Sequence, residues 1–346
     1  MKHLDLAPVL QPFGPLDDGH GPQPAETLPV ARLSGGLIND TFALGQHFIL
    51  QRLHTIFRPE VNLDIAALTP VLAAAGVPVP TIVRLPSGQP WLELAEPHAA
   101  LAGAWRILTR LPGETLHRLE NPAQAEAAGQ MVARFHTALR DLPHSFHFAR
   151  AGAHDTDAHF RTLAHALASQ PEHRLHAQVH EIGVELLQRW RAWGPIPQLP
   201  QRIIHGDLKV SNLLFSGDSV VGVLDLDTMA RSSLDIELGD ALRSWCNTAT
   251  EDDPAPHFDL TTYQAARRGY LAVAGAWLTA AEQGAIGRGV ERICLELAAR
   301  FAADALNERY FGWNLDKFPA RGEHNLARAR NQLGLARDVA LVRAQL

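Results

Sequence analysis

The segment HGDLKVSNLLFSGDSVVGVLDLD, residues 205–227, constrains the chain more than any other stretch of its sequence. Asp207 and Asn212 share a polar loop, and Asp225 ends an apolar run further along. Apolar segments flank the turn-forming residues 216–218, which predicts a β-hairpin between the loop and Asp225. A carboxylate in such a loop can orient a hydroxyl group and accept its proton, and Mg²⁺ prefers oxygen ligands. The pattern therefore predicts Asp207 as a catalytic base and Asn212 and Asp225 as ligands of Mg²⁺.

A simpler explanation is that Asp207 and Asn212 only hydrogen-bond within a turn while Asp225 ends a strand. The full pattern H-G-D-x-x-x-x-N, with Ile203 and Ile204 before it and the hairpin after it, is more specific than that explanation requires. It matches the catalytic and metal-binding loops of kinase-like phosphotransferases. On these residues the chain resembles the aminoglycoside phosphotransferase superfamily, whose loop reads HGD where protein kinases have HRD.

Within that superfamily the chain is most similar to the N-acetylhexosamine 1-kinase group. The likeness runs from about residue 30 to about residue 335 and rests on SGGLINDTF (34–42), FILQRL (48–53), HDT (154–156), LDLDTM (224–229), ELGDALRSWCN (237–247), ELAARFAADALNERYF (296–311) and HNLARARNQ (324–332). The resemblance implies an α+β, protein kinase-like bilobal fold. It also implies an ATP- and Mg²⁺-dependent kinase that phosphorylates the anomeric hydroxyl of an N-acetylated amino sugar.

The order of predicted elements also favours two lobes, since 346 residues exceed the usual size of a single hydrophobic core. Proline, glycine and alanine are frequent over residues 1–29, which predicts an irregular arm that allows a short helix over 5–13. Short strands and one helix over 60–75 predict a small nucleotide-binding N-lobe over residues 30–112. Pro112-Gly113 marks a hinge, and residues 113–346 form the expected helical C-lobe with the catalytic loop and the substrate pocket. Its predicted helices include 157–169, 173–193, 235–246, 260–281, 285–309 and 324–343.

The loop between the first two predicted strands of the N-lobe is the candidate nucleotide-binding loop. Glycines there let backbone N–H groups approach phosphate oxygens. Two glycines between strands, taken alone, are more often an ordinary turn. The downstream metal-binding pattern favours the binding role, which assigns Ser34, Gly35, Gly36 and Asn39 to the nucleotide.

The third strand of the N-lobe departs from the kinase-like pattern. Such folds usually place a phosphate-binding lysine there, whereas this chain has Gln51 and Arg52. Arg52 carries a permanent charge and a fork of donors that suit a phosphate, with a plain surface cation as the alternative. Glu60 and Asp64 are the candidates for its acidic partner.

The candidate acceptor-binding residues come from several segments. Asp227 follows Asp225 on the opposite side of an extended chain and could hold a second metal, contact substrate or cap the loop. Glu296, Arg300 and Asp304 share one helix face, which predicts either an exposed ion-pair ladder or, by the resemblance, a sugar pocket lined by Arg300.

Two further contacts are implied by the resemblance alone. Tyr310 is a possible sugar contact, although Ala305 replaces the tyrosine usual in that motif. Asp155 either faces the sugar hydroxyls or caps a helix. Asp207 would also touch the acceptor, since it aligns the hydroxyl group.

Composition excludes several other classes. A net charge of −6 argues against a surface that binds nucleic acid. No apolar run approaches the roughly 20 residues of a membrane span, and the N-terminus lacks the layout of a signal peptide. Cys246 and Cys294 are the only cysteines, which favours buried thiols in a reduced, cytoplasmic protein. The expected partner is a small-molecule substrate, and monomer and homodimer stay equally open.

Two alternatives to the amino-sugar kinase stay open. The first keeps the chemistry and changes the acceptor to an aminoglycoside, homoserine, choline or N-acetylmuramate, although the helix that carries Arg300 argues against a polycationic aminoglycoside. The second is a nucleotide-binding regulatory pseudokinase, which only the missing strand lysine supports. The intact set of Asp207, Asn212 and Asp225 argues against it.

Overall fold

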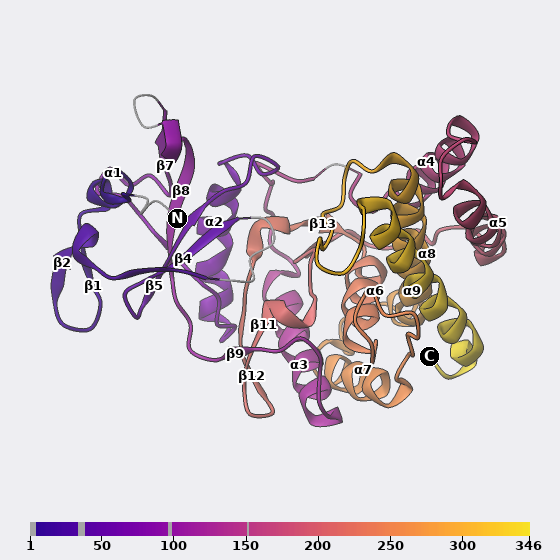
Figure 1. Cartoon of the computed structure of the whole chain (residues 1–346). Coiled ribbons are helices and arrows are strands. Elements are labelled where there is room, and N and C mark those ends of the chain that lie inside the picture. The colour runs from indigo at the N-terminus through magenta and orange to yellow at the C-terminus, as the bar shows by residue number, and fades with distance from the viewer. Residues whose placement is uncertain (1–4, 34–38, 96–98, 151) are drawn as a thin grey trace. The chain divides into compact units, whose positions relative to one another are not determined.

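The computed structural model describes residues 5–33, 39–95, 99–150 and 152–346 (Figure 1). The chain divides into two compact units. The first consists of Met1–Glu114, Ala138–Ala149 and Val221–Met229, and the second of Thr115–Thr137, Arg150–Val220 and Ala230–Leu346. The main segment of the first unit thus ends near the predicted hinge at Pro112-Gly113. The unit also includes two short segments from the expected C-lobe.

The first unit is built on a six-stranded antiparallel sheet. Its order is β3-β4-β5-β8-β6, and β7 also pairs with β8. The strands are β3 (Val30–Arg32), β4 (Asp40–Leu44), β5 (Phe48–Arg52), β6 (Ile82–Val83), β7 (Leu92–Leu94) and β8 (Gly103–Thr109). One helix, α2 (Val61–Ala74), accompanies the sheet and ends just before Gly76, whose φ of 72° a residue with a Cβ rarely adopts.

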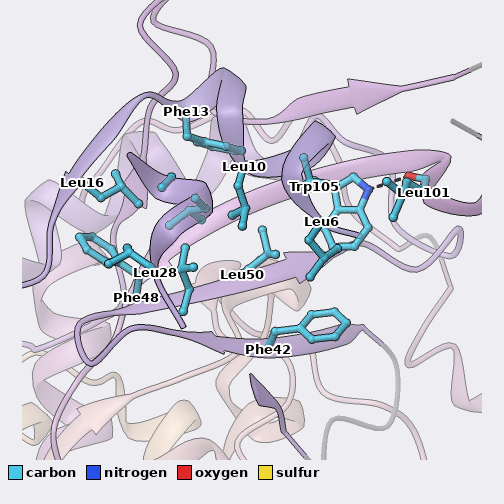
Figure 2. Close-up of a cluster of buried hydrophobic side chains, with 14 residues drawn as sticks. Leu6, Leu10, Phe13, Leu16, Leu28, Phe42, Phe48, Leu50, Leu101 and Trp105 are labelled. Atoms are coloured by element: carbon cyan, nitrogen blue, oxygen red, sulfur yellow. Dashed lines mark hydrogen bonds between the residues drawn. The ribbon is translucent and has the colours of Figure 1, made fainter. Parts of the chain in front are cut away.

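The N-terminal segment is part of the hydrophobic core of this unit. Figure 2 shows Leu6, Leu10, Phe13 and Leu16 among the side chains that gather with Trp105. Trp105 is fully buried, and its Nε1 donates to the main-chain oxygen of Leu101 at 2.7 Å. This segment carries α1 (Ala7–Leu10), the 3₁₀ helices η1 (Gln11–Phe13) and η2 (Ala25–Thr27) and the hairpin of β1 (Pro15–Asp17) with β2 (Pro22–Pro24). The expected irregular arm is therefore an ordered layer of the core, because its apolar side chains pack together.

The second unit is mostly helical. Its helices are α3 (Pro122–Leu139), α4 (Thr156–Ser169), α5 (His176–Trp193), α6 (Leu234–Trp245), α7 (Leu260–Ala274), α8 (Ala280–Asn307) and α9 (Arg321–Val342). Its shorter elements are β10 (Arg202–Ile204), which pairs with β13 (Ala230–Ser232), β11 (Leu213–Ser216) and the 3₁₀ helices η4 (Val210–Asn212) and η6 (Arg343–Gln345). Strands β9 (Glu114–Thr115) and β12 (Ser219–Val223) lie where the chain passes between units. Within the described residues, no helix combines the length and apolar character that crossing a bilayer requires.

Helix α8 is the centre of the second unit. It contacts α4, α5, α6 and α9 (Figure 1). Most of its residues are buried. A Cβ on Gly289 would lie 2.0 Å from the main-chain oxygen of Asp235, and one on Gly239 would lie 2.6 Å from the backbone of Gly289. The two glycines therefore let α6 and α8 pack backbone against backbone. Helix α6 in turn contacts β10 and η4, which flank the HGD sequence.

Candidate active site

The loop with the HGD sequence brings Asp207 and Asn212 together in the second unit. Asn212 Nδ2 donates to the main-chain oxygen of Asp207 at 2.7 Å and to its Oδ2 at 3.1 Å. Lys209 Nζ donates to the same Oδ2 at 2.7 Å. Asp207 Oδ1, in contrast, receives no hydrogen bond from the described residues. Oδ1 is therefore the oxygen that can accept a proton from a hydroxyl group.

A buried carboxylate on α6 holds this loop by its backbone. Glu237 Oε1 accepts the N–H of His205 at 2.7 Å, and Oε2 accepts the N–H of Gly206 at 2.9 Å. His136 Nε2 lies 3.2 Å from Oε1, and the hydroxyl of Tyr270 lies 2.9 Å from His136 Nδ1. Burial alone would raise the pKa of Glu237, but the His136 hydrogen bond and charge, together with the Gly206 N–H, lower it. The loop is thus attached to a charged group in the core.

Two other acidic residues of α6, Asp235 and Asp240, pair with arginines. Asp235 Oδ2 lies 3.3 Å from Arg292 Nη1, and Asp240 accepts from Arg243 at 2.9 Å. The support itself comes from Glu237, which lies between them on the same helix.

Asn212 in the second unit and Asp225 in the first each carry oxygen atoms of the kind that the predicted Mg²⁺ site needs. Asn212 uses its amide nitrogen for both bonds to Asp207, so its Oδ1 receives no hydrogen bond from the part of the chain that the structure describes. An amide oxygen and the carboxylate of Asp225 are the hard oxygen ligands that Mg²⁺ takes. Asn212 and Asp225 would hold the ion, which would supply neutralisation of the nucleotide phosphates.

Asp225 has an unusual backbone conformation in the first unit. It precedes the 3₁₀ helix η5 (Leu226–Thr228), and its φ of 61° and ψ of 60° lie in the left-handed region. Among the described residues other than glycine, only Glu308 shares a positive φ. Such conformations cost on the order of 1 kcal/mol or more and cluster at functional sites. The strain falls on the residue that the sequence predicted as a metal ligand.

The predicted nucleotide-binding residues are only partly described. Ser34, Gly35 and Gly36 lie outside the described residues. Asn39 is 9% exposed; its Nδ2 donates to Asp227 Oδ2 at 2.8 Å, and its Oδ1 accepts the His54 N–H at 2.9 Å. Asn39 therefore anchors the end of its loop.

The cation predicted for the phosphates, Arg52, already has partners. Its Nε and Nη2 donate to Asp40 Oδ2 at 3.0 and 2.5 Å, and Nη1 donates to the main-chain oxygen of Ala100 at 3.3 Å. Its guanidinium also lies 5.6 Å from the centroid of the Trp105 ring. A phosphate would have to compete with Asp40 for Arg52, so Arg52 stays a prediction.

The acidic residues proposed as partners of the strand cation serve other purposes. Glu60 pairs with Arg58 at 2.8 Å. Asp64 accepts the backbone N–H groups of His147 and Phe148 and lies 2.8 Å from His144 Nε2. Asp64 therefore fastens the returning loop of residues 144–148 to α2 within the first unit.

A cavity of about 300 Å³ opens in the second unit and contains two of the predicted acceptor contacts. Arg300 lies 5.9 Å from the centroid of the Tyr310 ring and 5.5 Å from that of Phe311. Tyr310 is 55% exposed, and its hydroxyl accepts from Arg150 Nη2 at 2.7 Å. Asp304 also lines the cavity. Arginine and aromatic side chains therefore dominate its wall.

The exposed ion-pair ladder considered for α8 does not form. Glu296 is fully buried and accepts from Thr156 at 2.6 Å, with His154 Nδ1 at 3.0 Å. Asp304 is 5% exposed and accepts three backbone N–H groups of residues 309–311, plus Asn325 Nδ2. Arg300 lines the cavity, and its Nη1 lies 4.0 Å from Oε1 of the buried Glu296.

Nearby charges shift the pKa values of His154 and Asp240 in the second unit. Burial opposes the imidazolium form of His154, but Glu296 and Asp240 raise its pKa against the opposing charge of Arg300. Asp240 in turn has its pKa lowered by Arg243, His154 and Lys209, against the effect of burial.

Asp155 has a structural role and does not line the cavity. It is the N-cap of α4, where its Oδ1 accepts the Ala158 N–H at 2.9 Å. Its neighbours His154 and Thr156 point instead to Glu296. The sequence allowed Asp155 either to face the sugar hydroxyls or to cap a helix. The structure shows the hydrogen bond of a helix cap.

Three residues near the predicted site were missed by the sequence argument. Lys209 lies within the HGD loop itself, and its spacing from Asp207 was the available signal. Glu237 and Arg106 come from distant segments, and no local pattern marks them. Arg106 forms a buried ion pair with Asp227 at 2.6 Å, so Asp227 is held inside the first unit.

The fold is of the protein kinase-like class. The family described as phosphotransferase enzyme family (APH) matches residues 29–277, and the chain belongs to this family. In the solved structure of the GDP complex of aminoglycoside 2′-phosphotransferase-IIIa, 92% of that chain matches 88% of this one, with a TM-score of 0.59 and 16% identity. For amicoumacin kinase hAmiN with AMP-PNP, Ca²⁺ and Ami, the TM-score is 0.60 at 17% identity, over 88% of this chain and 87% of that one. The predicted α+β, kinase-like fold is confirmed.

The curated relatives carry a different name from the group that the sequence motifs suggested. A homoserine kinase of Granulibacter bethesdensis is 29% identical over 70% of this chain and 67% of its own. One of Zymomonas mobilis is 26% identical over 72% of this chain and 73% of its own. The chain spans only about half of two homoserine kinases of Rhodopseudomonas palustris, 43% and 54% of their length. These relatives support the family and do not support the narrower N-acetylhexosamine kinase group.

Proposed function

We propose that the protein is an ATP- and Mg²⁺-dependent kinase that phosphorylates an alcohol group of a small molecule. The observation that carries this proposal is the arrangement of Asp207, in which Lys209 and Asn212 hold Oδ2 and leave Oδ1 open to a hydroxyl group. A module that only bound a nucleotide would have little use for an oriented base.

In the proposed reaction, Asp207 Oδ1 aligns the acceptor hydroxyl and accepts its proton. The hydroxyl oxygen forms a bond to the γ-phosphorus of ATP, the bond from that phosphorus to the β-phosphate oxygen breaks, and ADP leaves. Asn212 and Asp225 would hold Mg²⁺, which would supply charge neutralisation on the phosphates. The residues of the chain mainly position the reactants, because the loose transition state needs little covalent help.

For the acceptor we favour an N-acetylated hexosamine, and the charge of the cavity supports this choice. Arg150 and Arg300 line it, and the Asp304 carboxylate is fully engaged by backbone and Asn325 donors. A polycationic aminoglycoside would meet two arginines there and no unengaged carboxylate among the lining residues. A neutral sugar could donate and accept hydrogen bonds and pack a ring face on Tyr310.

L-Homoserine is the second candidate, and the names of the relatives favour it. Its carboxylate would suit Arg300, since a guanidinium binds a carboxylate through two parallel hydrogen bonds. Its ammonium group would need a carboxylate that Asp304 does not offer. The cavity thus offers a partner for the carboxylate of homoserine and none for its ammonium group among the lining residues.

An acceptor panel tests the proposal. ADP release would be followed with ATP, Mg²⁺ and either N-acetylglucosamine, N-acetylgalactosamine, L-homoserine, choline or kanamycin. Product mass and NMR would then assign the phosphorylated oxygen. Turnover of an N-acetylhexosamine at its anomeric hydroxyl, abolished in Asp207→Asn, is expected. If only homoserine is phosphorylated, homoserine takes the place of the N-acetylhexosamine as the proposed acceptor. Nucleotide binding without phosphorylation of any acceptor would favour a pseudokinase.

A further inference from the structure

Strand β5 has Gln51 and Arg52 where kinase-like folds usually have a lysine. The buried Arg106 lies on the neighbouring strand β8. In the antiparallel pair of β5 and β8, Gln51 lies directly opposite Arg106. Side chains opposite each other in such a pair share one face of the sheet. Arg106 therefore brings a positive charge to the face on which the strand lysine of kinase-like folds would project.

Every N–H of the Arg106 guanidinium has an acceptor. Nε and Nη2 donate to Gln51 Oε1 at 3.0 and 2.7 Å, and Nη1 donates to Asn62 Oδ1 at 3.1 Å. Nη1 and Nη2 also donate to the two carboxylate oxygens of Asp227, at 2.6 and 2.8 Å. A guanidinium has five N–H donors, and these bonds use all of them. Arg106 therefore has no donor left for a phosphate oxygen and can act only by holding other groups.

The ion pair is sealed from water. Arg106 is 2% exposed and Asp227 is 1% exposed. Removing either partner would leave a buried charge without its counterpart, so each side chain fixes the other. The Asp227 carboxylate thus accepts from Arg106 and Asn39, and its predicted contact with a metal or substrate stays a prediction.

Fixing Asp227 also fixes Asp225. Both belong to the tight turn of η5, in which Asp225 has its strained left-handed backbone. Asn39 adds a third bond to the Asp227 carboxylate, and Asn62 ties the same cluster to α2. The sheet, α2 and the end of the nucleotide-binding loop thus converge on the turn that presents Asp225.

We propose that Arg106 is a positioning residue for the metal-binding turn. Through Asp227 it fixes the backbone that would present Asp225 to Mg²⁺. Strand β5 has no lysine that could take this role. The inference rests on the proposed kinase function. It assigns to Arg106 a role in metal affinity and excludes direct contact with phosphate.

Arg106→Lys is the decisive variant, because lysine keeps the charge but cannot reach Gln51, Asn62 and Asp227 at once. The metal affinity would be measured by adding Mn²⁺ to protein saturated with AMP-PNP and following free Mn²⁺ by electron paramagnetic resonance. Supporting partners of a metal ligand typically contribute about 10- to 100-fold in metal affinity. We expect Mn²⁺ to bind about tenfold more weakly, with the KM for the acceptor unchanged.

Arg202→Lys is the matched control. Arg202 forms a comparable two-bond pair with Glu282 at 3.0 and 3.3 Å in the second unit. The Arg202→Lys variant should lower the midpoint of thermal unfolding about as much as Arg106→Lys does, and it should leave the Mn²⁺ affinity unchanged. Gln51→Leu removes the acceptor of two Arg106 bonds while keeping the ion pair, and it decides the matter if Arg106→Lys does not fold.

The outcomes separate this inference from the proposed function. Weaker Mn²⁺ binding in Arg106→Lys or Gln51→Leu, with Arg202→Lys unchanged, supports the positioning role. Wild-type Mn²⁺ affinity in folded Arg106→Lys and Gln51→Leu overturns it, even if the enzyme turns over its acceptor. A wild-type protein that takes up no Mn²⁺ with AMP-PNP and phosphorylates nothing overturns the proposed function and this inference together.

Discussion

Glu237 accepts the backbone N–H of His205 at 2.7 Å, so a carboxylate of α6 sets the position of the catalytic loop. The same carboxylate holds the Gly206 N–H, and Asp207 is the next residue along the chain. Glu237 is 2% exposed and makes no contact with the Asp207 side chain among the described hydrogen bonds. The orientation of Asp207, the proposed base, therefore depends on a group outside the proposed reaction.

Glu237→Gln tests this dependence. Glutamine keeps one acceptor oxygen and presents an NH₂ group to the other backbone N–H, which leaves a buried donor unsatisfied at about 1–3 kcal/mol. Misplacing a reacting group by about 1 Å can cost on the order of 10²-fold in rate. We expect kcat to fall by roughly that factor, with the KM for ATP little changed. Steady-state kinetics and thermal unfolding check both parts.

A surface carboxylate supplies the control for that variant. Glu126 pairs with Arg268 at 2.7 Å, and Glu126→Gln should alter neither kcat nor stability appreciably, since exposed pairs contribute little. An unchanged kcat in folded Glu237→Gln would show that the loop holds Asp207 without α6.

Lys209→Met should impair the chemical step. Its ammonium group lies 2.7 Å from Asp207 Oδ2, where it fixes the carboxylate and adds positive charge beside the reacting hydroxyl. Losing one preorganised donor of this kind typically costs about 10²- to 10³-fold in kcat. Lys317→Met, which removes an exposed lysine 3.4 Å from Asp252, is the control. Equal kcat values for the two variants would show that Lys209 does not contribute to the chemical step.

The proximity of Asp207 and Asn212 could be predicted from the sequence because their contact is local. Asp207 and Asn212 are close in the chain, so a short polar loop is enough to bring them together. Arg106 and Glu237 reach their partners only through strand register and helix packing, which a single sequence does not reveal. The pairing of Gln51 with Arg106 is such a case, since it depends on how β5 and β8 align.

Two local features were missed for different physical reasons. The N-terminal segment is rich in proline and glycine, yet Leu10 and Phe13 are buried because the sheet offers them an apolar surface. The helix predicted over 260–281 ends instead at Ala274. The next helix begins at Ala280 after a capping box in which Thr279 and Glu282 satisfy each other's backbone N–H groups. That signal, T-x-x-E, was visible in the sequence.

Arg300→Gln should weaken acceptor binding. The side chain lines the cavity beside Tyr310 and Phe311, and a hydrogen bond from a charged donor is typically worth about 1.5–3 kcal/mol. We expect the KM for the acceptor to rise by about 10- to 100-fold while the KM for ATP is unchanged. Arg330→Gln, which removes an exposed arginine bonded to Gln178, should leave both KM values unchanged. An unaltered acceptor KM in Arg300→Gln would place the acceptor elsewhere.

Asp155→Ala separates the helix cap from the sugar contact. Loss of an N-cap costs typically about 1 kcal/mol, and Asp155→Ser should restore most of it because serine also caps helices. We expect the alanine variant to unfold at lower denaturant concentration with an unchanged acceptor KM. A raised KM in both variants, without loss of stability, would instead assign Asp155 to the acceptor.

The pair of His154 and Glu296 should make stability depend on pH. Glu296 and Asp240 raise the pKa of His154 in the folded protein. Its stabilisation is therefore complete below the unfolded pKa of about 6.5 and is lost as the pH rises through the folded value. Relative to the wild type, His154→Gln should lose more unfolding free energy at about pH 6 than at about pH 9. Denaturant unfolding at both pH values measures this difference. His257→Gln, at an exposed imidazole 3.2 Å from Asp338, should show a small difference at both, because surface pairs contribute little. A His154→Gln deficit that is equal at the two pH values would mean that the imidazole acts through packing and not through its charge.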